Sequence, residues 1–138
     1  MSEFDDWNKK IIDEFRASGG TAEAFKGANL LLLHHTGAKS GAERVSPLVY
    51  MKSGESYAIF GSAAGGPRNP GWYYNLAAHP DTTIEVGTST VKVHARVATP
   101  EEREPLWARQ KEVAPGFAEY ETNAAPRQIP VVLLDPAK

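Results

Sequence analysis

Two glycine-rich, polar loops contain the residues of this sequence that are best suited to bind an anion. The first, "TGAKSGAER" (36–44), follows an apolar run, and the second, "GSAAGGPRN" (61–69), leads into an expected helix. Glycines allow backbone N–H groups to converge on an anion, and cations add charge-assisted hydrogen bonds. Three cations accompany the loops: Lys39, Arg44 and Arg68. A helix opening at Pro70 would add the positive end of its dipole beside Asn69. Either loop alone is also compatible with an ordinary turn that carries solvated cations, because short glycine-rich motifs are unspecific.

Other kinds of site have little support in the sequence. The chain has no cysteines, which excludes disulfides, thiolate zinc sites and a cysteine nucleophile. His34 and His35 are adjacent in an expected strand, so their side chains point to opposite faces and cannot bind one ion. His79 and His94 have no acidic or histidine partner at ligand spacing, and we therefore predict no metal site. The G-x-S-x-G, G-x-G-x-x-G and Walker motifs are all absent.

Aromatic residues gather after the second loop and near the C-terminus. Trp72 and Leu76 are four residues apart in an expected helix, a spacing that favours packing of both on the core. Phe117 and Tyr120 are three residues apart and could share one face over a ring-shaped ligand. Because core packing explains the same spacing, both interpretations stay open for this pair.

Hydrophobic patterns predict six strands that follow one another through short turns. They are expected at 29–35, 44–52, 57–62, 82–87, 89–99 and 129–134. Pro47 must lie at an edge or bulge, because it cannot donate to a strand ladder. In the fifth strand the inward-facing residues are expected to be Val91, Val93, Ala95 and Val97. Since the βαβ alternation of a parallel sheet is missing, we predict an α+β fold, a small antiparallel barrel with peripheral helices.

Three helices are expected around this barrel. The first, at 3–17, has an apolar face that packs on the barrel, with Ser2 as a cap and Gly19-Gly20 at its end. That face is formed by Phe4, Trp7, Ile11, Ile12 and Phe15. The second has Asn69 as its N-cap and Pro70 as its first residue. The third begins with a capping box at 99–102 and ends before Pro115-Gly116. The stretch "FAEYETN" is expected only as a short link to the last strand.

Composition places the chain among ordinary globular proteins. Its 138 residues fit a single domain, 1–138, whose residues 1–18 form the N-terminal helix. The net charge of −2 gives no reason to expect nucleic acid as a partner. The longest apolar run, Leu30–Leu33, is far below the roughly 20 residues of a membrane span, and the acidic start "MSEFDDWNKK" does not match a signal peptide. We expect a cytoplasmic protein.

Four stretches together carry a resemblance to a known family: "HTGAKSGAERVSPLVY", "GSAAGGPRNPGWYYNLAAHPDTTIEV", "VHARVATPEEREPLWARQ" and "YETNAAPRQIPVVLLDP". They resemble the deazaflavin-dependent nitroreductases, actinobacterial reductases that use coenzyme F420, over about residues 28–136. The resemblance implies a split β-barrel of the FMN-binding type. It also implies binding of F420, a deazaflavin with a phosphodiester and an oligoglutamate tail.

The resemblance also assigns roles to residues of this chain. It places the phosphate and the tail of F420 on the first loop, and the deazaflavin ring against the stretch around Ser62. The implied coenzyme contacts are Lys39, Ser40, Gly41, Arg44, Ser46, Pro47, Gly61, Ser62, Ala63, Ala64, Arg68, Asn69, Trp72 and Asn75. The positions that face the substrate in relatives correspond to Val49, Ala114, Phe117 and Tyr120.

Two departures from the family pattern concern function. Many relatives have lysine where this chain has Ala63, and several have tyrosines on the substrate side, where only Tyr120 keeps a hydroxyl here. We expect hydride transfer from reduced F420 to activated C=C bonds of enones, lactones or quinones, with nitro groups as further acceptors. Tyr120 and Ser62 are the candidate proton donors or substrate orienters.

Two alternatives remain beside this expectation. One is an FMN-dependent reductase of the same fold, and the other is a non-catalytic protein that binds the coenzyme or an apolar ligand. FMN has one phosphate and no acidic tail, so it would make less use of three spread cations. We expect a small-molecule substrate, and a monomer rather than a homodimer.

Overall fold

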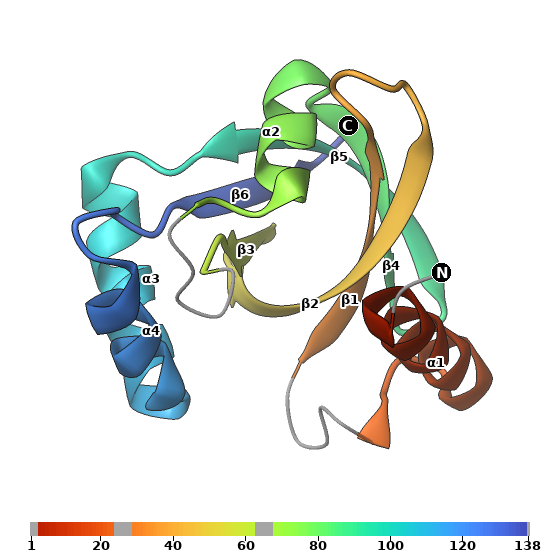
Figure 1. Cartoon of the computed structure of the whole chain (residues 1–138), viewed down its shortest axis with the longest axis horizontal. Helices are drawn as coiled ribbons and strands as arrows, with labels where there is room; N and C mark the ends of the chain where they lie inside the picture. The colour runs from red at the N-terminus through yellow and green to blue at the C-terminus, as the bar shows by residue number, and fades with distance from the viewer. Residues whose placement is uncertain (1–2, 24–28, 63–67, 138) are drawn as a thin grey trace.

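Six antiparallel strands form a closed barrel in the computed structural model, which describes residues 3–23, 29–62 and 68–137, with side chains from Asp6 onward (Figure 1). Around the barrel the strands are ordered β1-β2-β3-β6-β5-β4. Their bounds are Leu30–Thr36 (β1), Glu43–Ser53 (β2), Ser56–Phe60 (β3), Asp81–Val86 (β4), Ser89–Val97 (β5) and Val131–Pro136 (β6). All six predicted strands are therefore present, and the predicted fold class is confirmed.

The leucines of β1 explain why this strand is buried on both faces. Leu31 and Leu33 lie in the core cluster inside the barrel, whereas Leu30 and Leu32 pack against α1 (Glu3–Ser18). Alternate side chains of a strand point to opposite faces, so one apolar run serves two packing surfaces. This strand joins the barrel core to the N-terminal helix.

The helix α1 lies on the outside of the barrel through its predicted apolar face, where half-buried Ile12 packs beside buried Ile11 and Phe15. Ile11 and Phe15 are each 1% exposed, while Trp7 is 45% exposed and lies at the margin of that face. The helix ends as predicted, because the N–H groups of Gly19 and Gly20 both donate to the carbonyl of Phe15. The predicted cap Ser2 and the side chain of Phe4 lie outside the described part of the chain.

Three further helices are α2 (Gly71–Ala78), α3 (Pro100–Val113) and α4 (Gly116–Ala124). The predicted capping box of α3 is present: the Thr99 hydroxyl accepts from the N–H of Glu102, whose carboxylate accepts from the N–H of Thr99. The expectation of a short link after α3 was wrong, because that stretch forms α4. Its apolar residues Phe117, Tyr120 and Ala124 recur at helical spacing and pack on α3 and the barrel.

Two details of the strands bear on the predictions. At Pro47, β2 pairs with Leu32 of β1, and its pairing with β3 begins only at Tyr50. Pro47 therefore lies where one side of β2 is free, as an edge proline requires. The inward placement of Val97 was wrong: its side chain is 56% exposed, because β5 extends there beyond the core and Ala98 turns inward instead.

Candidate functional site

The first glycine-rich loop is a tight turn between β1 and β2. The N–H of Gly37 donates to the carbonyl of Ala42 at 2.8 Å, and the N–H of Gly41 donates to the carbonyl of Gly37 at 2.9 Å. Gly41 has a φ of +71°, a conformation that strains residues with a side chain. Both glycine N–H groups are thus engaged inside the turn. The loop groups that remain for an anion are the N–H groups of Lys39 and Ser40, which bond to no described residue, and the exposed Lys39 side chain.

A chain of side chains fixes this turn to the rest of the molecule. Asn75 of α2 accepts the N–H of Ala38 on its Oδ1 (2.9 Å) and donates from its Nδ2 to Nδ1 of His35 (2.9 Å). With Nδ1 as the acceptor, Nε2 of His35 carries the proton and donates to the Ser46 hydroxyl at 2.9 Å. The predicted contacts Asn75 and Ser46 therefore meet through a histidine that sequence reasoning placed only in a strand.

His35 is neutral in this network. It is 5% exposed, and burial, followed by the positive charge of Arg44 and of His34, lowers its pKa from 6.5 to about 4. A neutral imidazole can accept on one nitrogen and donate from the other, which the Asn75–His35–Ser46 chain requires.

The three predicted cations are exposed and available. Lys39 lies in the turn, Arg44 pairs in register with His35 at the start of β2, and Arg68 lies just before α2. None of them forms an ion pair with a residue that the structure describes, whereas Arg16, Arg96 and Arg103 each do. An external anion would therefore not compete with a protein carboxylate for these three groups.

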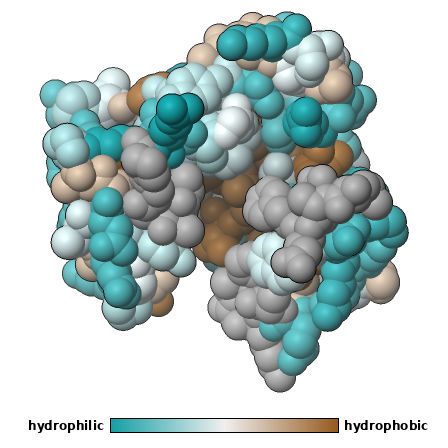
Figure 2. Space-filling view, viewed as in Figure 1, coloured by the Kyte–Doolittle hydropathy of each residue, from teal (hydrophilic) through white to brown (hydrophobic). Residues whose placement is uncertain are grey.

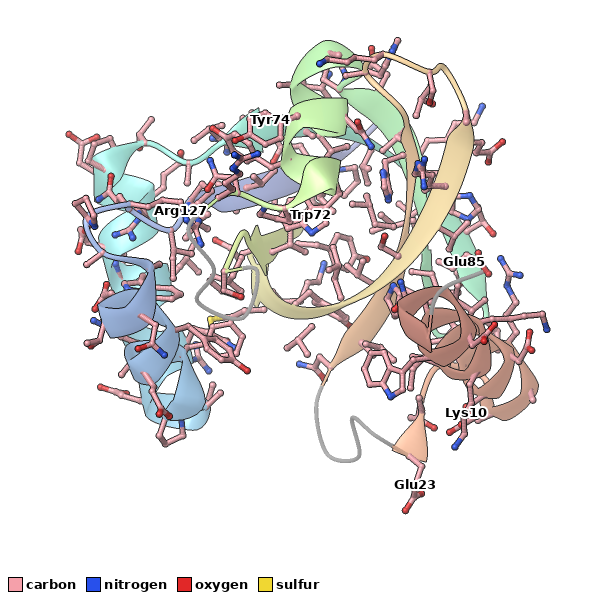
Figure 3. All side chains as sticks on the ribbon, in the orientation of Figure 1. Lys10, Glu23, Trp72, Tyr74, Glu85 and Arg127 are labelled. Atoms are coloured by element: carbon pink, nitrogen blue, oxygen red, sulfur yellow. The ribbon has the colours of Figure 1, made fainter. Side chains whose placement is uncertain are left out.

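The described residues at the two ends of the second loop are bound by Arg127, a residue that sequence reasoning missed. Its guanidinium donates to the carbonyl of Gly61 (2.9 Å), the carbonyl of Ser62 (2.8 Å) and Oδ1 of Asn69 (2.6 Å). Figure 3 shows Arg127 between the chain that follows α4 and the chain that enters α2. The sequence shows only an arginine shortly before the last apolar strand. Composition alone does not distinguish such an arginine from an ordinary surface cation.

Arg127 also explains why the predicted cap of α2 was wrong. The N-cap is Pro70, with no side-chain cap bond, because the side chain of Asn69 is bound to Arg127 instead. Trp72, on the barrel side of α2, is 7% exposed and belongs to the core cluster (Figure 3). Two predicted contacts, Ala63 and Ala64, lie outside the described residues.

The predicted substrate residues are only partly brought together. Phe117 and Tyr120 have ring centroids 5.2 Å apart, and Phe117 also contacts Phe60 and Trp107 edge-on. Ala114 caps α3 and accepts the N–H of Phe117. These residues form one aromatic cluster at the α3–α4 junction. Val49 lies apart from it in sequence, opposite Leu30 in the β1–β2 ladder.

The hydroxyls of the candidate proton donors have no partner among the residues that the structure describes. Ser62 is 9% exposed. Among the described residues, neither its hydroxyl nor that of Tyr120 has a hydrogen-bond partner, although the carbonyl of Ser62 accepts from Arg127. Both hydroxyls are therefore available to a bound molecule.

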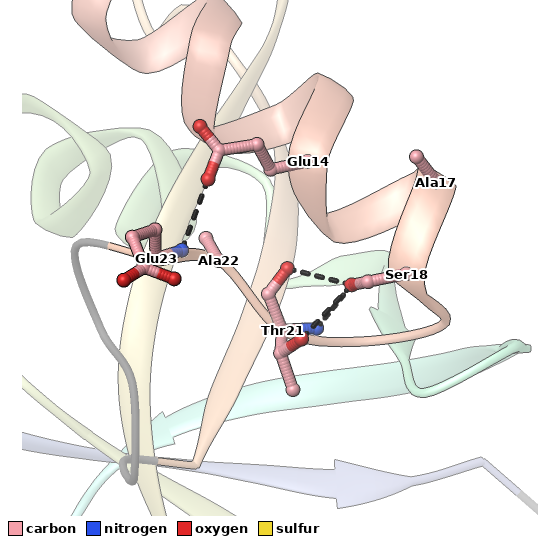
Figure 4. A pocket seen from close by; sticks show the side chains of 6 residues that line it. All are labelled: Glu14, Ala17, Ser18, Thr21, Ala22 and Glu23. Atoms are coloured by element: carbon pink, nitrogen blue, oxygen red, sulfur yellow. Dashed lines mark hydrogen bonds between the residues drawn. The ribbon is translucent and has the colours of Figure 1, made fainter.

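Hollows are present on the part of the surface that the described residues form. Figure 2 shows one with a hydrophobic floor near the middle of the face, between the side that carries α3 and α4 and the side that carries α1. A cavity of about 330 Å³ lies between the end of α1 and residues 21–23, with Glu14 accepting the N–H of Glu23 (Figure 4). A groove of about 270 Å³ runs between α2 and β5 past Tyr73 and Val97. The cavity and the groove contain none of the predicted site residues.

The histidines do not form metal sites in the part of the chain that the structure describes. No group of three or more His, Asp or Glu side chains there could hold an ion. Two of the histidines nevertheless have acidic partners that sequence spacing did not indicate: His34 lies 2.7 Å from Glu85, and His94 lies 2.7 Å from Asp81. No helix within these same residues is long and apolar enough to cross a membrane.

Comparisons with known proteins decide the family. The sequence model described as F420H(2)-dependent quinone reductase matches residues 7–136. A protein of Mycobacterium tuberculosis (strain H37Rv) named as an F420H(2)-dependent quinone reductase is 40% identical over 109 residues, which are 75% of this chain and 71% of that relative. The chain belongs to the F420H(2)-dependent quinone reductase family. It is therefore an oxidoreductase, as predicted.

Solved structures agree with this membership of the F420H(2)-dependent quinone reductase family. The structure of an F420-H2 dependent reductase, FDR-A, is 36% identical, with a TM-score of 0.69, and covers 77% of this chain and 93% of that one. A second structure, described as a domain-swapped dimer, is 30% identical, with a TM-score of 0.71 and 96% of both chains covered. The family names support F420 and give the FMN alternative no support; the dimeric neighbour leaves the monomer expectation without support.

Proposed function

We propose that this protein binds reduced F420 and uses it to reduce quinones and related activated C=C bonds, with nitro compounds as further acceptors. The observation that carries the proposal is the arrangement of the two loops around α2. Asn75, in the last turns of this helix, holds the first loop, and the second loop leads into its first residue. The loop held by Asn75 carries Lys39 and ends at Arg44, and Arg68 lies just before the start of α2.

The spacing of these cations suits an extended anion. From Gly71 to Asn75, α2 advances four residues, or about 6 Å at the rise of an α-helix, and Arg68 lies three residues before Gly71. A phosphodiester followed by an oligoglutamate tail can reach charges at both ends of that span, whereas one compact phosphate reaches only one end. Exposed cations without protein carboxylates fit such a tail, because each can form a charge-assisted hydrogen bond.

The remaining residues would act on the ring and the acceptor. When bound, the deazaflavin supplies a hydride at its C5. The chain's own task is to hold donor and acceptor in near-attack geometry and to limit access of water. Ser62 and the Arg127-bound backbone would orient the ring. The aromatic cluster of Phe117 and Tyr120 would contact a flat acceptor, and the Tyr120 or Ser62 hydroxyl could deliver the proton that completes reduction.

A side-by-side titration tests this proposal. Purified protein is titrated with oxidised F420 and with FMN, and the absorbance of reduced F420 is then followed with a quinone, an enone and a nitro compound. We expect binding of F420 in preference to FMN, and oxidation of reduced F420 that depends on both protein and quinone. Binding of FMN alone would contradict the proposal, as would tight F420 binding without turnover of any acceptor.

Arg44→Ala tests the role of the cations. Loss of one charge-assisted hydrogen bond, about 1.5–3 kcal/mol, should raise the Kd for F420 roughly tenfold or more. Arg109→Ala is the matched control, because Arg109 is an exposed arginine on α3, a helix with none of the predicted coenzyme contacts, and its loss changes the net charge equally. Equal Kd values for the two variants in a fluorescence titration would rule out the assignment of Arg44.

A further inference from the structure

We propose that Arg127 is a positioning residue for hydride transfer, acting by fixing Gly61 and Ser62 after β3 relative to Asn69 before α2. The inference rests on the proposed function, because Ser62 is the residue expected to lie against the deazaflavin ring. Arg127 is not among the predicted coenzyme or substrate contacts.

The geometry places one guanidinium between the start and the end of the second loop. Nη1 donates to the Gly61 carbonyl and to Oδ1 of Asn69, and Nη2 donates to the Ser62 carbonyl, at 2.6 to 2.9 Å. Gly61 leaves the barrel directly after β3, and Asn69 lies two residues before α2. Arg127 therefore sets the separation of the two ends, eight residues apart in the sequence.

The carbonyls of Gly61 and Ser62 both accept from Arg127, and this restricts the backbone conformation at these two residues. In an extended strand, neighbouring carbonyls point to opposite sides, so Gly61 and Ser62 cannot both reach one partner unless the chain has left the strand conformation. The N–H of Gly61 donates to the carbonyl of Pro130 at 2.9 Å, and a Cβ added at Gly61 would come within 2.8 Å of the Pro130 ring. The stretch 127–130 thus holds the bend at Ser62 from two directions.

Arginine is required for this arrangement. A planar fork with five N–H donors can serve three acceptors in different directions, whereas a lysine ammonium is a compact point charge that cannot span them. Loss of the fork would let Ser62 shift relative to α2 without removing any cation of the first loop. A misplacement of about 1 Å at a reacting centre can lower a rate by about a hundredfold. The effect should therefore fall on hydride transfer and not on capture of the anionic tail.

Arg127→Lys and Arg103→Lys together form the test. Arg103 is a buried arginine of α3 that donates from Nε and Nη2 to the carbonyl of Ile129, in the same 127–130 stretch, but has no bond to Gly61, Ser62 or Asn69. For each variant we would measure the Kd for F420, the single-turnover rate of reduced F420 oxidation by a quinone at saturating coenzyme, and the absorbance band of bound oxidised F420.

The expected result separates the two arginines. Arg127→Lys should lower the single-turnover rate by at least about tenfold and shift the band of the bound ring, while the Kd changes less than about threefold. Arg103→Lys should lower thermal stability but keep the rate and the band. A wild-type rate in Arg127→Lys, or an equal loss in Arg103→Lys, would overturn the proposal.

Failure of the proposed function gives a different result. Wild-type protein that neither binds F420 nor oxidises its reduced form would overturn the proposed function itself, whatever the variants do. If Arg127→Lys does not fold, Arg127→Gln takes its place, because a single amide group with two N–H donors cannot reach both carbonyls and the Asn69 side chain at once. The rate should then fall with an unchanged Kd, and an unchanged rate would count against the positioning role.

Discussion

At the scale of single residues, Asn75 shows how a predicted contact can act through the protein. The resemblance assigns it to the coenzyme, and that assignment stays a prediction. In the structure its amide accepts from the Ala38 N–H and donates to His35. Its influence on the coenzyme can therefore run through the turn that carries Lys39, because losing the bond to Ala38 releases the turn from α2.

Asn75→Ala should raise the Kd for F420 about fivefold, since one neutral hydrogen bond contributes about 1 kcal/mol. Tyr74→Ala is the control, because Tyr74 is the preceding residue of α2 and is 50% exposed. If Asn75 acts by holding the loop, Asn75→Ala and Arg44→Ala should be non-additive in a double-mutant cycle. Additive effects in fluorescence titrations would show that the two residues act independently.

At the scale of elements, the turn between β1 and β2 depends on one left-handed glycine. Gly41 has a φ of +71°, Gly54 in the β2–β3 turn has a φ of +61°, and no atom lies within 4 Å of a Cβ added at either position. Alanine at each position meets the same backbone strain, about 1 kcal/mol, with no steric clash. The two turns can therefore be compared directly, and only the β1–β2 turn carries predicted coenzyme contacts.

Gly41→Ala and Gly54→Ala should therefore destabilise the protein equally but affect the coenzyme differently. We expect Gly41→Ala to raise the Kd for F420 several-fold because the turn that presents Lys39 is displaced, and Gly54→Ala to leave the Kd unchanged. Urea unfolding gives the stability and fluorescence titration gives the Kd. A comparable rise in Kd for both variants would show that general destabilisation, and not the loop, controls binding.

The elements also show which features a sequence can predict. The α3 capping box and the six strands were predictable because their signals lie within a few neighbouring residues. The clamp by Arg127 and the histidine link between Asn75 and Ser46 were not, since each joins residues that are 11 to 66 positions apart. Asn69 shows the consequence: its local signal for an N-cap was overridden by a partner 58 residues away.

At the scale of the whole molecule, His35 joins the barrel to α2. It lies in β1, bonds to Ser46 of β2 and Asn75 of α2, and is almost fully buried. No local rearrangement is needed to keep it neutral at pH 7, but global unfolding exposes it to water. Its protonation is therefore linked to the stability of the entire fold.

The free energy of unfolding should consequently fall as the pH drops from 7 to 5. The pKa of His35 is about 6.5 when unfolded and about 4 when folded, so the unfolded chain binds an extra proton in this window. The contribution is fully present above pH 6.5 and is lost as the pH falls, by at most about 3 kcal/mol near pH 4. Urea unfolding at pH 7.5, 6 and 5 measures this slope.

The variant His35→Gln removes the titrating group while keeping an amide that can donate and accept. It should be less stable than wild type at pH 7.5, but its free energy of unfolding should vary much less between pH 7.5 and 5. His79→Gln is the control, because His79 is an exposed histidine and its variant should keep the wild-type slope. The carboxylates with lowered pKa values, Glu85, Glu102, Glu121 and Asp135, are present in both wild type and variant, so their proton uptake cancels in the comparison. Parallel curves for wild type and His35→Gln would contradict a buried, neutral His35 and with it the hydrogen-bond chain that holds the first loop.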